Sequence, residues 1–239
     1  MTYKQNISNL YEVILKQFRY SLKIIFANKF IYFMSAAFIF FLIVAVINLF
    51  AVSNADIGDV YYLLLFPGIL LIFYPATFGI QNDEDTGMLE NIFAIPNYRY
   101  KVWLPRLVMI YILVFCLLLA LSLLSSFALV PVPLFEMVYE LMFPIFFLGS
   151  LAFAMSTVVR NGNGTAVVVI IIGLVFWISA EPLEGSAWNL FLNPFEVPRD
   201  MNESIWATVI TTNRLYLLSG TILCLLLGLF NLQKREKFM

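Results

Sequence analysis

Residues 30–52 read FIYFMSAAFIFFLIVAVINLFAV and contain no charged side chain. A helix needs about 20 mostly apolar residues to cross the hydrocarbon core of a bilayer. This run is long enough to span, and no signal-peptide-like apolar region precedes it. We therefore expect it to be the first transmembrane helix.

The rest of the chain repeats this pattern. Of the 239 residues, 62% are hydrophobic and 12% are charged, whereas a soluble domain is nearer half apolar and a quarter charged. A bilayer must therefore solvate the excess. We expect an all-α polytopic membrane protein of one domain (1–239) with six spans. The predicted spans are Phe30–Val52, Val60–Ile80, Leu104–Val130, Glu140–Val159, Thr165–Ala180 and Leu215–Leu232.

The basic residues predict the orientation of these spans. Of the 14 Lys and Arg, only Arg199 and Arg214 fall on one side, and all others fall on the opposite side. The positive-inside rule then places both termini in the cytoplasm, with 233–239 as a tail, in the cell inner membrane. This arrangement requires an even number of spans. The net charge of −1 gives no reason to expect nucleic acid as a partner.

Residues 1–29 predict a helix that lies on the membrane surface. Apolar residues recur at steps of three and four between Leu10 and Ile25, and three basic residues project from the opposite face. The alternative is an ordinary amphipathic helix packed on another subunit.

Charged residues are absent from the middle of each predicted span. Glu136, Glu140, Arg106 and Arg214 lie at span ends, where we expect them to be interface anchors. Charges at membrane depth usually mark proton relays or ion paths, so the pattern disfavours a proton-coupled transporter or a charge-lined channel. The chain has no His, which disfavours an intramembrane hydrolase. The two cysteines, both in apolar runs, predict packing and no metal site.

Aromatic residues crowd the second predicted span. Packing and interfacial belts explain most such residues. The alternative is a route for an apolar or amphiphilic substrate, with Phe66, Phe73 and Tyr74 as candidates. Pro67 and Pro75 permit kinks in this span, which suit a moving interface but also occur in static proteins.

The connection Gln81–Trp103 begins QNDEDTGMLENIFAIPNYR. Its acids, Asp83 to Asp85, lie before or at the start of a predicted short helix, where they would face the positive end of the helix dipole. Asp85 or Thr86 is the expected cap.

The residues that follow form one apolar face of this short helix. Leu89, Ile92, Phe93 and Pro96 recur at i, i+3, i+4 and i+7, and the proline ends the helix. Such a helix either lies on the bilayer or fits a groove in a partner protein, and the residues alone leave both open.

The same loop resembles the signature of the ABC-2 family of ABC-transporter permeases. There, the end of span two is followed by a pattern close to Glu-x-Glu-x-Gly-Thr-Leu-Glu, then apolar residues, a proline and a basic residue. Met88 stands where Thr is usual, and the spacing around Asp85 departs slightly. The order of elements is similar along nearly the whole chain, as are 193–195 (Asn-Pro-Phe) and 235–237 (Arg-Glu-Lys). The matching positions are Glu84, Gly87, Leu89, Glu90, Ala94, Pro96 and Arg99.

The resemblance implies the transmembrane subunit of an ATP-driven exporter. Two permease chains, identical or different, would pair with two ATP-binding subunits, and spans two and five would line the path. ATP and Mg would be held by the partner, so this chain is expected to be no enzyme and to bind no cofactor; it contains no Gly-x-x-x-x-Gly-Lys-Ser/Thr. The alternatives are a scaffold or assembly subunit that moves nothing, and a channel or secondary carrier. The implied ATPase-docking residues are Glu84, Gly87, Leu89, Glu90, Ile92, Phe93, Pro96 and Arg99.

The segment Glu181–Arg214 is long for an irregular connection. Its apolar residues indicate that it dips into the outer leaflet, as short re-entrant helices of the resembling family do, or that it forms a cap on the spans. Uncharged spans favour a lipid-like, amphiphilic or apolar cargo, and nothing in the sequence identifies it.

Overall fold

The computed structural model describes residues 30–50 and 56–233. The helix predicted for 1–29 and nearly all of the predicted tail lie outside these ranges. The described residues form helices and turns, without strands. The elements are α2 (Phe30–Phe50), α3 (Ile57–Asp85), α4 (Met88–Ala94), a short π-helical stretch (Arg99–Trp103), α5 (Leu104–Ala128), α6 (Leu134–Val159), α7 (Gly162–Ala180) and α8 (Glu203–Asn231).

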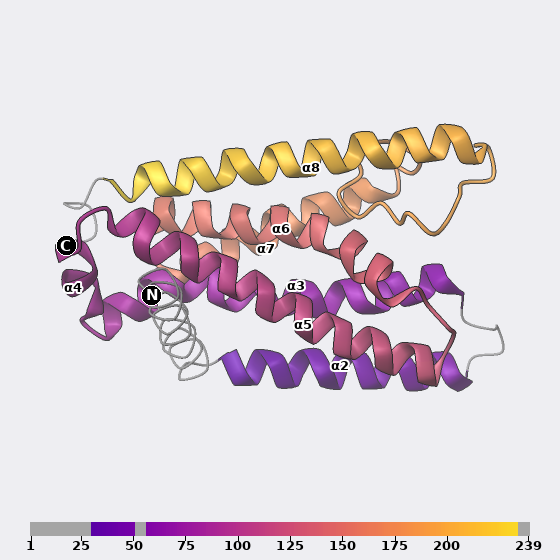
Figure 1. The fold of residues 1–239 in the computed structure, drawn as a ribbon, viewed down its shortest axis with the longest axis horizontal. Coiled ribbons are helices and arrows are strands. Elements are labelled where there is room, and N and C mark those ends of the chain that lie inside the picture. The colour runs from indigo at the N-terminus through magenta and orange to yellow at the C-terminus, as the bar shows by residue number, and fades with distance from the viewer. Residues whose placement is uncertain (1–29, 51–55, 234–239) are drawn as a thin grey trace, which may run out of the picture.

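Six of these helices are long and apolar enough to cross a membrane, and they run side by side along the long axis of the molecule (Figure 1). The short α4 lies at one end of this bundle, where α3 and α8 end and α5 begins. We refer to this as the α4 end and to the opposite end as the far end. The expected six-span, all-helical membrane fold is confirmed.

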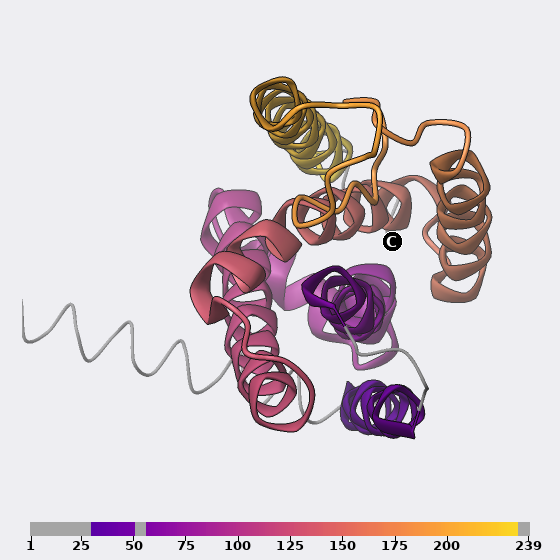
Figure 2. The ribbon, with the colours of Figure 1, turned by 90° about the vertical axis from the view of Figure 1, so that its right-hand side faces the viewer.

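Helices α3 and α6 form the centre of the bundle. Seen along the bundle axis, α2, α5, α7 and α8 stand around this pair (Figure 2). Within the most apolar stretch of α6, 72% of the residues are buried, against 11% for α7. The exposed sides of α2 and α7 are apolar, as expected for surfaces that lie against lipid or another chain.

Glycines allow the central helices to approach closely. A Cβ on Gly149 of α6 would lie 2.5 Å from Ile72 Cγ1 of α3 and 2.8 Å from the Tyr111 hydroxyl of α5. A Cβ on Gly228 of α8 would lie 2.6 Å from the Phe153 ring of α6. Small residues at such contacts are typical of helix packing in membranes.

Helices α3, α6, α7 and α8 begin earlier than the apolar runs predicted, α3 and α7 by one turn or less and the other two by more. Helix α6 begins at Leu134 rather than Glu140, and α8 begins at Glu203 rather than Leu215. The first turns of α8 mix polar with apolar residues, so they did not form a continuous apolar run. Asn202 caps this start by accepting a hydrogen bond from a backbone N–H of the first turn at 2.9 Å.

The connection between α7 and α8 is therefore shorter than expected. It comprises residues 181–202, which the structure describes in full as turns without a helix; we call it the cap. Residues 190–192 are buried, and Asn193 Nδ2 donates to the Gly58 carbonyl of α3 at 3.2 Å. These contacts pack the cap onto the spans, while its entry into the outer leaflet stays a prediction.

Candidate functional site

The connection between α3 and α5 begins with acids that belong to α3. Residues 83–85 form the last turn of α3, so they lie before the short helix and do not begin it. The Thr86 hydroxyl donates to the Asn82 carbonyl at 2.8 Å and helps to close α3, and neither predicted cap is used. Helix α4 instead begins after Gly87, whose φ of 67° is left-handed and favours glycine.

Asp83 is stabilised at this position by a buried ion pair. Arg106 Nη1 of α5 donates to Asp83 Oδ2 at 2.5 Å, and the two side chains are 12% and 2% exposed. A carboxylate at a helix C-terminus opposes the dipole, and a buried one needs a partner, so Arg106 offsets both costs. The expectation that Arg106 is an interface anchor is wrong, because its guanidinium faces inward and lies 5.5 Å from the centre of the Trp103 ring.

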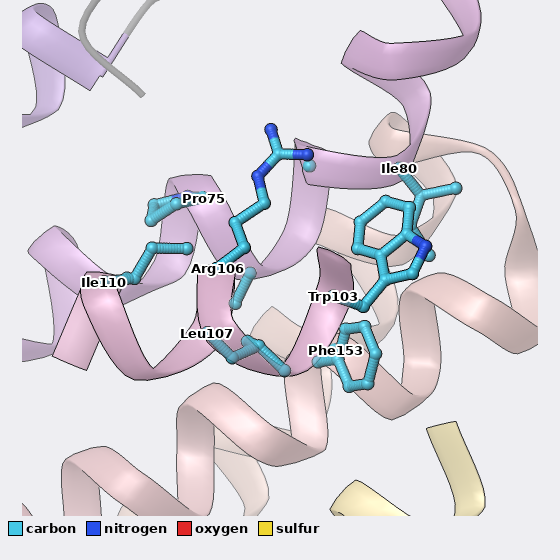
Figure 3. A pocket seen from close by; sticks show the side chains of 9 residues that line it. Pro75, Ile80, Trp103, Arg106, Leu107, Ile110 and Phe153 are labelled. Atoms are coloured by element: carbon cyan, nitrogen blue, oxygen red, sulfur yellow. The ribbon is translucent and has the colours of Figure 1, made fainter. Parts of the chain in front are cut away.

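A small pocket lies beside the Arg106 side chain, between α3 and α5 (Figure 3). Its volume is about 10 Å³, and its lining includes Pro75 and Gly79 of α3 and Phe153 of α6. A Cβ on Gly79 would meet no atom within 4 Å. The inner parts of α3 and α5 are therefore packed less tightly here than at Gly149.

Helix α4 is a short helix that ends before the proline, as the sequence predicted. It covers Met88–Ala94 and ends before Pro96. Its apolar face packs on the chain itself, because Leu89 and Phe93 are buried in the core of the bundle and Ile92 packs against that core. The face that the sequence offered to a bilayer or a partner is therefore covered by the bundle.

The outward side of this loop is acidic. Glu84, Asp85 and Glu90 are exposed, and no Lys or Arg occurs from 84 to 97. The predicted docking residues thus divide into an outward group and an inward group that supports α4. The exposed residues are Glu84, Asp85, Thr86, Gly87, Glu90, Asn91, Ala94, Ile95, Pro96 and Asn97.

The segment between α4 and α5 (95–103), which we call the elbow, is hydrogen-bonded to the end of α8. The Tyr98 hydroxyl donates to the Leu232 carbonyl. Arg99 Nη1 donates to the Leu229 carbonyl at 3.3 Å and to Gln233 Oε1 at 3.4 Å. The last carbonyls of a helix have no intrahelical donor, and a cation is favourable there. Arg99 therefore caps α8 in this structure.

Two further contacts join spans at the α4 end. The Gly162 N–H at the start of α7 donates to Gln81 Oε1 of α3. Asn231 Nδ2 of α8 donates to Thr157 Oγ1 of α6 at 3.3 Å. Together with the ion pair and the elbow, these bonds connect α3, α5, α6, α7 and α8 around the base of α4.

The far end holds a second buried ion pair. Arg214 Nε of α8 donates to Glu140 Oε2 of α6 at 2.7 Å, with side chains 8% and 15% exposed. Arg214 Nη1 also donates to Asn213 Oδ1 at 2.8 Å, and Tyr61 of α3 lies beside the pair. Glu140 and Arg214 are therefore not the interface anchors that we expected, because each has its partner inside the bundle.

Helix α8 also holds the cap. Asn213 Nδ2 donates to the Ala187 and Asn189 carbonyls at 2.9 and 2.8 Å, and Trp206 Nε1 donates to the Pro194 carbonyl at 3.2 Å. A cavity of about 600 Å³ lies between the cap, α3 and α8. Its charged lining residues are Glu184, Glu196, Arg199 and Asp200.

The three aromatic candidates for a substrate path lie toward α2. The Phe66 ring is 4.3 Å from Phe40, and the Tyr74 ring stacks on Phe33 at 4.8 Å. Phe73 contacts Phe33 as well, at 6.3 Å. In this chain α2 partly covers these rings, and their role in transport stays a prediction.

Sequence reasoning missed the two ion pairs and the ties to α8. For the ion pairs, the sequence did contain a signal, namely the order of the spans. The order of six spans already places Asp83 with Arg106 at one end of the bundle and Glu140 with Arg214 at the other. Which side chains face one another depends on helix rotation, which the sequence alone did not define.

Comparisons with protein-family models, with curated proteins and with solved structures found no match to the chain. The resemblance to ABC-2 permeases therefore stays an expectation from the sequence. Among the described residues, no group of three or more His, Cys, Asp or Glu is placed to hold a metal ion.

Proposed function

We propose that this chain is the membrane subunit of an ATP-driven exporter. It forms half of a substrate path with a second permease chain, and its α4 end faces the cytoplasm and docks a separate ATP-binding subunit. ATP and Mg bind to that partner, since this sequence has no phosphate-binding P-loop.

The observation that carries the proposal is how α4 is held. A helix of seven residues is unstable alone, but here Leu89 and Phe93 fix it to the bundle while Glu90 and Pro96 face outward. We call the exposed residues between Glu84 and Asn97 the α4 ridge. Because the ridge is already rigid, it loses little conformational entropy on binding, which favours a contact with a protein.

The charge of this ridge helps to decide between the two surfaces that the sequence left open for α4, a bilayer and a partner protein. A helix that lies on a membrane needs an outward apolar face and basic residues near anionic lipid headgroups. Leu89, Ile92 and Phe93 of α4 point inward, and the exposed residues between Glu84 and Asn97 include three acids and no base. These features support a protein partner with a complementary basic groove.

Co-purification tests the proposal. The chain is co-expressed with a candidate P-loop ATPase, solubilised in detergent and purified through a tag on this chain. We expect the ATPase to be retained, and Glu90→Arg to reduce its amount at least about tenfold, because like charge at a docking surface is strongly unfavourable.

The matched control is Glu203→Arg, which reverses an exposed acid at the far end. It should leave retention unchanged. If the unmodified chain never retains the ATPase, or if Glu90→Arg retains as much as the control, the assignment of the α4 ridge is wrong.

A further inference from the structure

The elbow after α4 is hydrogen-bonded to the last span, a contact that no pattern in the loop predicted. Tyr98 and Arg99 donate to carbonyls at the end of α8. We propose that α8 is the strut that carries displacement of the α4 loop to the cap at the far end. This inference rests on the proposed docking of an ATP-binding subunit at α4.

The joint at the α4 end connects α4 itself to α8. The Phe93 ring, on the buried face of α4, meets the Tyr98 ring edge-on with centres 5.0 Å apart, and the Tyr98 hydroxyl reaches the Leu232 carbonyl. Arg99 adds bonds to Leu229 and Gln233. A shift of α4 is therefore passed to the end of α8 through the Tyr98 ring, which contacts Phe93, and through the hydrogen bonds that Tyr98 and Arg99 donate.

Helix α8 is suited to carry such a shift. It runs unbroken over 29 residues, or about 43 Å at 1.5 Å per residue, which exceeds the bilayer hydrocarbon core. Helices α3 and α6 contain internal prolines, which permit bending, whereas α8 contains none. Its Ser219-Gly220 pair is the remaining place where it can bend, and Gly220 packs closely on the Phe147 ring of α6. A continuous helix that reaches both ends of the bundle can carry a displacement from one end to the other.

The joint at the far end connects α8 to the cap. Asn213 holds the Ala187 and Asn189 carbonyls, and Trp206 holds the Pro194 carbonyl. The neighbouring Arg214 links the same turn of α8 to α6. Movement of α8 therefore alters the contacts that keep the cap, and the cavity beneath it, in place.

The experiment reports on the cap while perturbing the elbow. In a background with Cys116→Ala and Cys224→Ala, Ala187→Cys provides a half-buried reporter in the cap. Its labelling rate with a soluble maleimide is measured in lipid nanodiscs that contain the complex with the ATP-binding subunit, because both faces of the membrane are accessible there. The rate is compared without nucleotide and after trapping with ATP and vanadate, and is expressed per bound ATPase.

We expect nucleotide to change the labelling rate at least about fivefold in the parent, the lower range of measured couplings between sites. The variant Tyr98→Phe/Arg99→Gln should lose this response. Tyr100→Phe removes the same hydroxyl from an exposed position on the same elbow and should keep it.

Each outcome decides between the proposals. A response that survives in Tyr98→Phe/Arg99→Gln, or one that is also lost in Tyr100→Phe, overturns the α8 strut. A parent complex that retains the ATPase but never shows a response overturns the strut and leaves the docking proposal standing. If the parent retains no ATPase, the docking proposal fails and the strut fails with it.

Discussion

The buried pair between Glu140 and Arg214 allows a direct test of the packing at the far end. Arg214→Leu removes the 2.7 Å bond to Glu140 and the 2.8 Å bond to Asn213. It leaves Glu140 as a carboxylate that is 15% exposed and has lost its ion-pair partner. The double variant Glu140→Leu/Arg214→Leu removes both charges and leaves neither without a partner.

The cost of the single change follows from burial. Removing one partner of a buried ion pair typically costs about 3–5 kcal/mol, because the other charge stays buried without compensation. The partial exposure of Glu140 admits some solvent screening, so we expect about 2–4 kcal/mol for Arg214→Leu. For a chain of this size that corresponds to a melting temperature lower by about 5–15 °C. Replacing both partners with apolar residues is often neutral, so the double variant should recover most of the loss.

These shifts in melting temperature are measured on the detergent-purified protein. Samples are heated to a series of temperatures, and size-exclusion chromatography gives the fraction that stays folded at each. The control is Arg199→Leu, an exposed arginine at the same end, which should change the melting temperature by no more than about 2 °C. If Arg214→Leu behaves like this control, or if the double variant is as unstable as the single one, the pair does not stabilise the far end as we argue.

Three further predictions concern other parts of the bundle. Gly149→Ala should destabilise by about 1–3 kcal/mol because the added methyl group meets side chains of α3 and α5, whereas Gly79→Ala, beside open space, should stabilise by up to about 1 kcal/mol; thermal shifts of the same sign would contradict this packing. Asn213→Ala should speed hydrogen–deuterium exchange in the cap, because two hydrogen bonds to it are lost, and should not affect the α4 end; unchanged exchange in the cap would refute its anchoring. Asp83→Ala should lower stability by about 2–4 kcal/mol because Arg106 loses its buried partner, and adding Arg106→Leu should restore part of it; equal melting temperatures for the single and double variants would argue against the pair.

The sequence predicted the membrane fold well because hydropathy is a one-dimensional signal. A run such as 30–52 has no soluble alternative, and Pro96 ends α4 by local sterics. The start of α8 was predicted too late because its first turns are helical but mix polar with apolar residues. Local capping by Asn202 extends that helix beyond the apolar run, and hydropathy does not register capping.

The apolar face of α4 shows a different limit. The spacing of Leu89, Ile92 and Phe93 predicted one apolar stripe, and the stripe is present. Periodicity defines which side of a helix is apolar, but it does not define what covers that side. Here the bundle of the same chain covers the apolar side. The candidate docking surface is therefore formed by Glu90 and its exposed neighbours and not by the apolar stripe. Arg99 likewise serves the end of α8, a contact 130 residues away in the chain that no local pattern reveals.

The positions of the two ion pairs reconcile buried charges with spans that are apolar in the middle. Tyr61 lies beside the Arg214 pair and Asp83 belongs to the other pair, and both residues are on α3. The separation of 22 positions corresponds to about 33 Å along a helix, close to the thickness of about 30 Å of the hydrocarbon core. We therefore expect the pairs to lie near the two borders of the apolar layer, where water and headgroups reduce the cost of charge, although each pair is closed inside the bundle. Each pair ties a central helix, α3 or α6, to a neighbouring helix, α5 or α8, at its own border. Between the two pairs, the described spans are joined by packing and by a hydrogen bond from the Tyr111 hydroxyl of α5 to the Phe146 carbonyl of α6 at 3.1 Å. Charge-assisted bonds are stronger than such neutral ones, so the two ion pairs are where relative movement of the spans is most directly resisted or transmitted.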